Sequence, residues 1–482
     1  MMHTRLSEFV ENLVIDRKKL PIGDENDRIL RILEPDAVVL CLGIRTPICK
    51  ANKGSFKSMC SDELLSSVLS EVVKRIPHVP LEALGEVMVG TCLQPGGGQA
   101  MARMAAFEAG FPYSVPVATI NRQCASGLQA IASVADAIRS QSFRTGNYVQ
   151  FDSNSTANVA SLSIMQKMPS QLVHDTGSHL QCQLAIAAGV ESMSTCSFDE
   201  GTPIVNWTAV KKSRLAAACM IPMGITSENI AKLYGITRQE MDAYALESHR
   251  RADAAQKAGH FEDEILPISD VKIDGGIRSD CTAKSLAALP TVFLPEFGTT
   301  TAGNSSQTSD GAAAVLLASE ITRQQMNLPL LCVWRHYVVV GTPPEIMGVG
   351  PAYAIPALLH KACLTVADID VFEINEAFAS QAIFCVRMLG LDPAKVNPYG
   401  GAIALGHPLG CSGTRLVVTC AHYLRRRNLR YGVVSLCVGT GMGAAALIEN
   451  PAYTAREKKN KQETPSDVHQ TSVDHNPRQS KL

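Results

Sequence analysis

The sequence has few aromatic residues and few charged ones. Phe, Trp and Tyr make up 5% of its 482 residues, and Asp, Glu, Lys and Arg make up 18%. The formal net charge is −1, so the chain as a whole has no field that would attract nucleic acid or an anionic membrane surface. A polyanionic ligand would need a local basic patch. An apolar content of 46% excludes a fibrous or disordered chain and is typical of a globular α/β enzyme.

Paired cysteine spacing is also absent. The chain has fifteen cysteines, an odd number, without a Cys-x-x-Cys motif, and we recognise no secretory leader. This usage predicts reduced intracellular thiols, most of them small core residues. We expect Cys41, Cys92, Cys332 and Cys385 to be structural thiols of this kind. We expect no metal and no resident cofactor.

Long hydrophobic runs are rare. The uncharged run 431–448 is long enough to raise the question of a membrane span, but its glycines, Ser and Thr argue against a spanning helix. A buried strand, a Gly-rich turn and a second strand explain it better. We therefore expect no membrane span.

The remaining pattern alternates strands with helices. Buried-strand patterns cover 36–43, 86–90, 116–120 and 184–191, and helical periodicity covers 61–76 and 237–258. After the strand at 116–120, apolar residues recur at helical spacing at Leu128, Ile131, Val134, Ala135 and Ile138.

A faint internal repeat joins the two ends of the core. Residues 310–317 resemble residues 442–448, and the turn and helix at Cys124 resemble the turn and helix at His407. Two similar halves facing each other would bring Cys124 and His407 together. We divide the chain into an N-terminal extension at 1–35, a first half at 36–196 completed by 309–329, a loop domain at 197–308, a second half at 330–450 and a disordered tail at 451–482.

Residues 121–127 place Cys124 at a turn from a strand into a helix. Backbone N–H groups at a helix N-terminus favour negative charge, so we expect the pKa of this thiol to be lowered. His407 lies in the Gly-rich stretch 400–410, and Cys437 opens a second Gly-rich stretch at 437–443. Two thiols and one imidazole in such turns indicate nucleophilic catalysis by cysteine.

Six stretches together carry a family resemblance. Residues 36–450 resemble the thiolases, and most closely the peroxisomal 3-ketoacyl-CoA thiolases, at 121–127, 221–229, 301–306, 373–378, 400–410 and 437–443. The resemblance implies an α/β thiolase fold. Two βαβαβαββ halves would stack as α/β/α/β/α layers with an inserted loop domain, and the assembly would be at least a homodimer.

The resemblance also implies the chemistry, which is thiolysis of 3-ketoacyl-CoA by CoA through an acyl-cysteine in fatty acid β-oxidation. Cys124 would be the nucleophile, His407 would take its proton, and Cys437 would shuttle protons. A thiol suits the last task because its pKa can lie near the working pH once an ion or dipole stabilises it. One oxyanion site would be His407 with a water held by Asn375. The other would be the backbone N–H groups of Cys124 and Gly439, where the lack of a Cβ allows close approach. Asn375 could also simply cap a helix through residues 376–378.

Substrate contacts follow from the same resemblance. Ser306 would contact the pantetheine arm of CoA, Met223 would line the acyl or pantetheine tunnel, and Arg278 would lie near the adenine end. Arg278 could equally be a plain surface residue. Lys211, Lys212 and Arg214 form a basic cluster that faces either phosphate or solvent.

Residues 147–183 depart from the family pattern. They are either a surface insertion or translated intron sequence, and removing them restores the pattern almost without a gap. The chain ends in Ser480, Lys481 and Leu482, the address read by the peroxisomal import receptor. Asn12 replaces the usual His or Gln in a stretch that resembles a second, N-terminal peroxisomal signal.

The residues also bear on three other functions. A biosynthetic acetoacetyl-CoA thiolase tends to have His-Met where this chain has Pro222 and Met223. A decarboxylating ketoacyl synthase lacks a cysteine in the place of Cys437. A non-catalytic acyl-CoA binder, impaired by the extra stretch, is disfavoured because all the catalytic positions are filled.

Overall fold

The computed structural model describes residues 33–142, 183–198 and 204–454. The N-terminal signal, nearly all of the extra stretch and the terminal Ser480, Lys481 and Leu482 lie outside these residues. No helix among the described residues has the length and apolar character needed to cross a membrane.

The first half is a five-stranded mixed sheet with one short addition. Its order is β4-β3-β5-β6-β1, in which β3 runs parallel to β4 and β5, and β6 runs antiparallel to β5 and β1. The strands are β1 (Val38–Arg45), β3 (Val87–Gly90), β4 (Val117–Ile120), β5 (Leu184–Ser192) and β6 (Ser309–Ser319), and the two-residue β2 (Cys49–Lys50) pairs with β6.

The second half repeats this order with one strand reduced. The sheet continues as β7-β10-β9-β8, formed by β7 (Cys332–Gly341), β8 (Val371–Ile374), β9 (Tyr431–Val438) and β10 (Met442–Glu449). Its third strand shrinks to a single parallel bridge between Phe372 and Val396. Pro393 and Pro398 flank this segment, and proline removes the N–H groups that a longer ladder needs. The expected strand, turn and strand at 431–448 is confirmed as β9 and β10.

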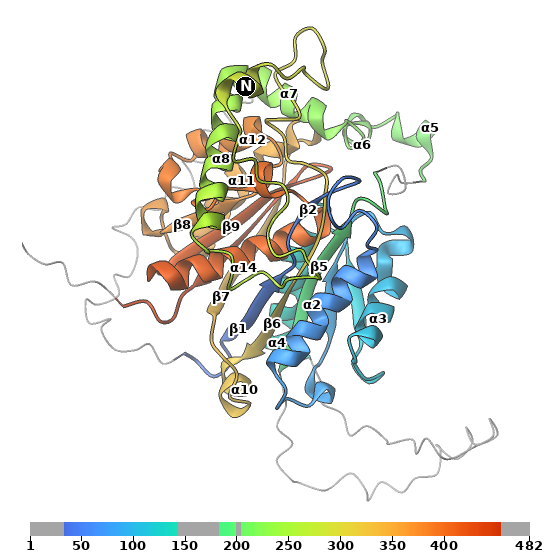
Figure 1. Cartoon of the computed structure of the whole chain (residues 1–482), viewed down its shortest axis with the longest axis vertical. Coiled ribbons are helices and arrows are strands. Elements are labelled where there is room, and N and C mark those ends of the chain that lie inside the picture. The colour runs from blue at the N-terminus through green and yellow to red at the C-terminus, as the bar shows by residue number, and fades with distance from the viewer. Residues whose placement is uncertain (1–32, 143–182, 199–203, 455–482) are drawn as a thin grey trace, which may run out of the picture.

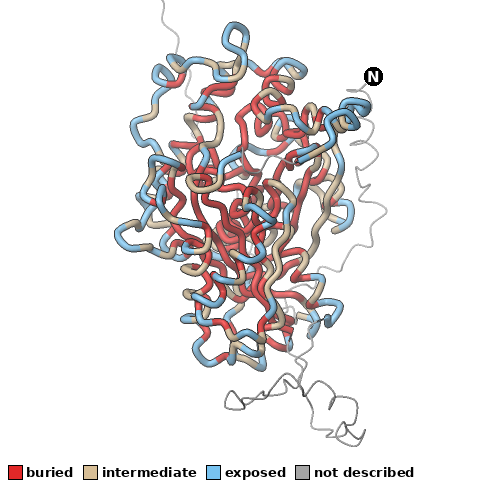
Figure 2. The backbone as a smooth tube through the Cα atoms, turned by 90° about the vertical axis from the view of Figure 1, so that its right-hand side faces the viewer, coloured by how far each residue is buried: buried red, intermediate tan, exposed pale blue. Residues whose placement is uncertain are grey.

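Helices cover both faces of this sheet and fill the space between the halves (Figure 1). The helices α2 (Ser61–Arg75) and α3 (Gln99–Glu108) cover the outer face of the first half, and α11 (Gly350–Ala362) covers that of the second. Between the halves, α4 (Ser126–Arg139) packs against α14 (Leu409–Arg427). Buried backbone is concentrated in these central layers (Figure 2).

Glycines allow α4 and α14 to approach closely. A Cβ on Gly413 would lie 2.3 Å from the backbone N of Leu128, and a Cβ on Gly127 would lie 2.6 Å from the carbonyl oxygen of Gly410. Since real Cβ contacts are longer, these two positions require glycine. The first turns of the two central helices, which follow Cys124 and His407, are therefore held together.

The loop domain covers one end of these layers (Figure 1). Its longest helix, α8, begins at a capping box between Thr237 and Glu240, as the pattern at 237–258 predicts. Its helices are α5 (Trp207–Val210), α6 (Arg214–Ala218), α7 (Met223–Tyr234), α8 (Arg238–Lys257) and α9 (Ala283–Ala287). The remaining helices are α10 (Glu320–Gln325), α12 (Ala379–Met388), α13 (Ala402–Leu405) and the 3-10 turns η2 (Leu81–Ala83), η3 (Pro95–Gly98), η7 (Pro344–Val349), η8 (Val366–Asp368) and η9 (Pro393–Lys395).

Candidate active site

Cys124 lies in a tight turn between β4 and α4. Gln123 has a left-handed backbone with φ of 47°, and its N–H donates to Asn121 Oδ1 at 2.8 Å. The N–H of Arg122 donates to Ser126 Oγ at 2.9 Å. These bonds fix the turn, and Cys124 is 2% exposed at its end.

The Cys124 sulfur receives backbone N–H groups but sits in a dry environment. Its own N–H and that of Gly439 both face the sulfur and lower the pKa of the thiol. Burial outweighs them and raises the pKa to about 11, with a further rise from the Glu191 charge. The expected lowering of the Cys124 pKa is therefore wrong for the free protein, because desolvation exceeds the effect of the helix N-terminus.

His407 is held by one hydrogen bond on each ring nitrogen. Its Nε2 lies 3.2 Å from Asn375 Nδ2, and its Nδ1 lies 2.5 Å from Ser412 Oγ. Ser412 donates its own proton to the carbonyl oxygen of Pro408, so its oxygen accepts from Nδ1–H. The Nε2 lone pair then accepts from the Asn375 amide. Burial, with Arg415 adding to it, lowers the pKa of His407 to about 3, so the imidazole is neutral.

Cys437 is the penultimate residue of β9 and lies in a cluster against which the loop domain packs. It is fully buried in a cluster with Met347, Ala377 and Phe378, and Met223 packs against this cluster. Burial raises the pKa of Cys437 well above its ordinary value, with a smaller contribution from Cys124. A Cys437 pKa near the working pH therefore requires an ion or dipole that offsets this burial.

The Gly-rich turn after Cys437 needs glycine at one position more than at the other. Gly441 has φ of 95°, and a Cβ there would lie 2.5 Å from the carbonyl oxygen of Thr342. A Cβ on Gly439 would meet only Gln123, at an ordinary 3.4 Å. Packing within the protein therefore explains why residue 441 is glycine. It does not explain why residue 439 is glycine, where the lack of a Cβ leaves room for a group that approaches the N–H.

The family models match this chain in both halves. The model described as thiolase, N-terminal domain, matches residues 38–159 and 178–321, and that described as thiolase, C-terminal domain, matches residues 328–450. This chain belongs to the thiolase family. The matches pass over residues 160–177, within the extra stretch that departs from the family pattern.

Curated relatives of this thiolase include peroxisomal enzymes. The peroxisomal 3-ketoacyl-CoA thiolase of Homo sapiens is 48% identical over 428 residues, which cover 86% of this chain and 91% of that protein. The peroxisomal 3-ketoacyl-CoA thiolase 2 of Arabidopsis thaliana is 46% identical, with 86% and 84% covered.

Solved structures confirm the expected fold class. The dimeric peroxisomal thiolase of Saccharomyces cerevisiae is 41% identical with a TM-score of 0.76, covering 87% of this chain and 99% of that one. A second structure of the yeast peroxisomal enzyme is described as five-layered and built from two core domains of identical topology. The human mitochondrial 3-ketoacyl-CoA thiolase in complex with CoA is 34% identical with a TM-score of 0.71, covering 86% and 98%.

The expected substrate contacts of this thiolase fall into two groups. Met223 packs beside Cys437, and the N–H of Ser306 donates to the carbonyl oxygen of Ala377 at 3.0 Å, two residues after Asn375. Arg278 is exposed instead, and its charge acts on Lys50, which Lys53 also faces. In the other basic cluster, Arg214 pairs with Glu345 at 3.6 Å.

Sequence reasoning missed the residues that orient the catalytic groups, and it offered one role that the structure rejects. Asn375 caps no helix, because α12 begins at Ala379 with Phe378 as its N-cap. Ser412 was missed, although a hydroxyl one helical turn beyond His407 is a readable signal. Cys92 behaves as the expected structural thiol, because burial raises its pKa and its sulfur donates to Gln123 Oε1 at 3.3 Å.

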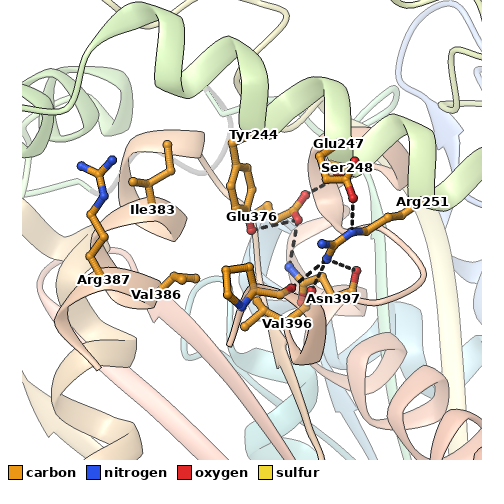
Figure 3. Close-up of a pocket in the computed structure, with 11 residues that line it drawn as sticks. Tyr244, Glu247, Ser248, Arg251, Glu376, Ile383, Val386, Arg387, Val396 and Asn397 are labelled. Atoms are coloured by element: carbon orange, nitrogen blue, oxygen red, sulfur yellow. Dashed lines mark hydrogen bonds and ion pairs between the residues drawn. The ribbon is translucent and has the colours of Figure 1, made fainter. Parts of the chain in front are cut away.

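A pocket of about 260 Å³ lies between α8 and α12 and is not the catalytic centre (Figure 3). Its polar side is built on Glu376, which accepts hydrogen bonds from Tyr244, Ser248 and Asn397. This carboxylate joins the loop domain to the segment that carries Asn375. The hydrogen bonds of Glu376 on this side of the pocket therefore hold the backbone next to Asn375 in place.

Proposed function

We propose that this thiolase cleaves 3-ketoacyl-CoA with CoA, giving acetyl-CoA and a shortened acyl-CoA, in peroxisomal β-oxidation. The observation that carries the proposal is the site itself: two buried thiols, each close enough to affect the ionisation of the other, and an imidazole just before α14 that is bound to Asn375. The names of the curated relatives support the same acetyl-CoA C-acyltransferase activity and the same compartment.

The first half-reaction uses Cys124 and His407. The Cys124 proton passes to the imidazole while the sulfur attacks the ketone carbon, and the bond between that carbon and the thioester α-carbon then breaks. The acyl group stays on Cys124, and the released enolate takes a proton from Cys437 to become acetyl-CoA.

The second half-reaction returns every proton. The Cys437 thiolate takes the proton of incoming CoA, whose sulfur attacks the acyl carbon and releases Cys124 as a thiolate. That thiolate recovers its proton from His407. In both half-reactions, the N–H groups of Cys124 and Gly439 that now face the sulfur are donors for a developing oxyanion.

A water on Asn375 completes the second oxyanion site. Asn375 Oδ1 is fully buried and makes no hydrogen bond with any described residue, so it has a free acceptor for such a water. His407 Nε2 lies on the amide of the same residue. Asn375 thereby serves both the imidazole and the oxygen of the substrate.

CoA itself is held by the loop domain at 197–308 and the basic residues beside it. Met223 lies beside Cys437, and Ser306 lies on the segment that follows Asn375, so both can contact bound CoA. Arg278 with Lys50 and Lys53 provides positive charge for phosphate. CoA enters these steps as a substrate, and the proposed steps use no metal and no resident cofactor.

The working assembly is a homodimer formed at the edge of the first half. Among the described strands, β4 pairs only with β3, and the neighbouring surface exposes Met104, Phe107 and Tyr113. An unpaired strand edge next to apolar side chains is suited to pairing with a second copy. Import uses the terminal Ser480, Lys481 and Leu482 as a receptor address.

The decisive experiment is a thiolysis assay with purified wild-type protein and the Cys124→Ser variant. Wild type should convert medium- and long-chain 3-ketoacyl-CoA, and the variant should fold normally with almost no turnover. Activity confined to acetoacetyl-CoA would instead favour a biosynthetic thiolase. CoA binding without turnover by wild type would favour the non-catalytic binder.

A further inference from the structure

Glu191 is a fully buried carboxylate that touches both halves of the molecule. It is the penultimate residue of β5, and its two oxygens accept the N–H groups of Cys92 at 2.9 Å, Leu93 at 3.1 Å and Gly410 at 2.9 Å. The hydroxyl of Thr91 adds a fourth bond at 3.2 Å. In the part of the chain that the structure describes, no Lys, Arg or His forms an ion pair with it.

The three donors at residues 91–93 lead to Cys124. Residues 91–93 follow β3, and the carbonyl oxygen of Cys92 accepts from Asn121 Nδ2 at 3.0 Å. The Cys92 sulfur contacts Gln123 Oε1 as well. Glu191 therefore holds the segment on which the Cys124 turn rests.

The remaining donor, Gly410, leads to His407. Gly410 lies three residues after His407 in the first turn of α14, and a Cβ on it would lie 2.6 Å from the Cα of Thr91. The backbone of the second half thus reaches the carboxylate directly. A single side chain connects the supports of the nucleophile and of its base.

We propose that Glu191 is a positioning residue of the thiolase site, whose carboxylate fixes the His407 turn against the Cys124 turn. The proposal rests on the catalytic roles of Cys124 and His407 given above. The negative charge of Glu191 also opposes formation of the Cys124 thiolate. Burial raises the pKa of Glu191 itself to about 7, so this charge is present above about pH 8.

The titratable groups that face Glu191 come from three elements. Cys92 faces it from the turn after β3, Cys124 from the turn before α4, and Cys411 from α14. Among the described residues, none of these groups carries a positive charge. Removing the carboxylate charge therefore has one expected sign on the nearby thiols, which is easier ionisation.

Two variants separate the effect of side-chain length at position 191 from the effect of its charge. Glu191→Asp keeps the charge but shortens the side chain, so it cannot span both turns. Glu191→Gln keeps the length but loses the charge and one acceptor. We expect kcat to fall about 100-fold in both, since small misplacement of a catalytic group has an effect of this size. The KM values for CoA and for 3-ketoacyl-CoA should change less than threefold.

Alkylation of Cys124 by iodoacetamide supplies the second readout, measured on the full chain between pH 8 and 11. The rate profile of Glu191→Gln should shift to lower pH, while that of Glu191→Asp should stay near the wild-type position. A merely structural defect would slow turnover without shifting one profile selectively.

The matched control is Glu320→Gln. Glu320 is a similarly buried carboxylate, bound to Arg323 and Gln324. It follows the last residue of β6, whereas Glu191 lies near the other end of that strand, where Ser192 pairs with Asp310. Its variant should keep wild-type kcat. Wild-type kcat in folded Glu191→Asp, or equal losses of kcat in the Glu191 and Glu320 variants, would overturn the proposal while leaving the thiolase activity intact. If Glu191→Gln does not fold, Glu191→Asp decides by its kcat.

Discussion

The amide of Asn375 and the imidazole of His407 meet at 3.2 Å, although one follows β8 and the other precedes α14. Ser412 holds the opposite ring nitrogen at 2.5 Å. Together they select the tautomer with hydrogen on Nδ1 and a lone pair on Nε2. The orientation of the base is thus set by two neutral partners rather than by a carboxylate.

The Ser412→Ala variant tests this orientation. It leaves the Nδ1–H buried without an acceptor, and such a loss is worth about 1–3 kcal/mol. We expect kcat to fall about tenfold or more, with KM nearly unchanged, in a steady-state thiolysis assay. Ser319→Ala is the control, since Ser319 caps α10 at 3.3 Å from the N–H of Thr322. It should cost about 1 kcal/mol of stability and no activity, and equal losses of kcat in both variants would contradict the orientation argument.

The resting thiol should ionise only at high pH. Burial raises the pKa of Cys124 to about 11 and lowers that of His407 to about 3, so proton transfer between them is unfavourable in the free enzyme. The alkylation rate of Cys124 by iodoacetamide should therefore keep rising from pH 8 to about pH 11. Mass spectrometry of the Cys124 peptide measures this rate. A rate that reaches its plateau below pH 8 would show that the thiolate is already formed and would contradict this account.

The same shift in His407 affects stability on the acid side. The folded pKa is depressed relative to the ordinary 6.5, so the unfolded chain binds this proton first as the pH falls. The stability contribution is present above about pH 6.5 and is lost as the pH falls toward 3. Urea unfolding of His407→Asn should show a weaker decline between pH 6 and 4 than wild type, and identical slopes would contradict the shift.

Close packing of the central helices should be sensitive to one methyl group. Gly413→Ala places a Cβ 2.3 Å from the backbone of Leu128, and overpacking of this kind costs about 1–3 kcal/mol. Gly341→Ala is the matched control, because its Cβ would have nothing within 4 Å. Urea denaturation should show a loss of stability for Gly413→Ala alone. An equal loss in both variants would contradict the tight contact between α4 and α14.

Sequence patterns anticipated the fold and the chemically distinctive residues. Apolar runs indicated β1, β3, β4, β5, β9 and β10. Cys124, His407 and Cys437 stood out because each lies in a Gly-rich or strand-to-helix turn. These features are local in sequence. The family resemblance added the layered arrangement, which the described residues and the solved structures agree on.

The sequence could not predict the environment of the site residues. The direction of the Cys124 and Cys437 pKa shifts depends on how many distant segments exclude water, which no local pattern gives. Glu191 is a single charge at the end of an apolar strand, and its four donors come from residues 91–93 and 410. Contacts across such separations are invisible to periodicity.

The most direct test of the central claim is the covalent intermediate on Cys124. Wild-type protein should be mixed with acetyl-CoA without a thiol acceptor, acid-quenched and digested for mass spectrometry. We predict an acetyl group on the Cys124 peptide that disappears when CoA is added and is absent from Cys124→Ser. An adduct on Cys437 instead, or thiolysis without any acylated Cys124, would contradict the account.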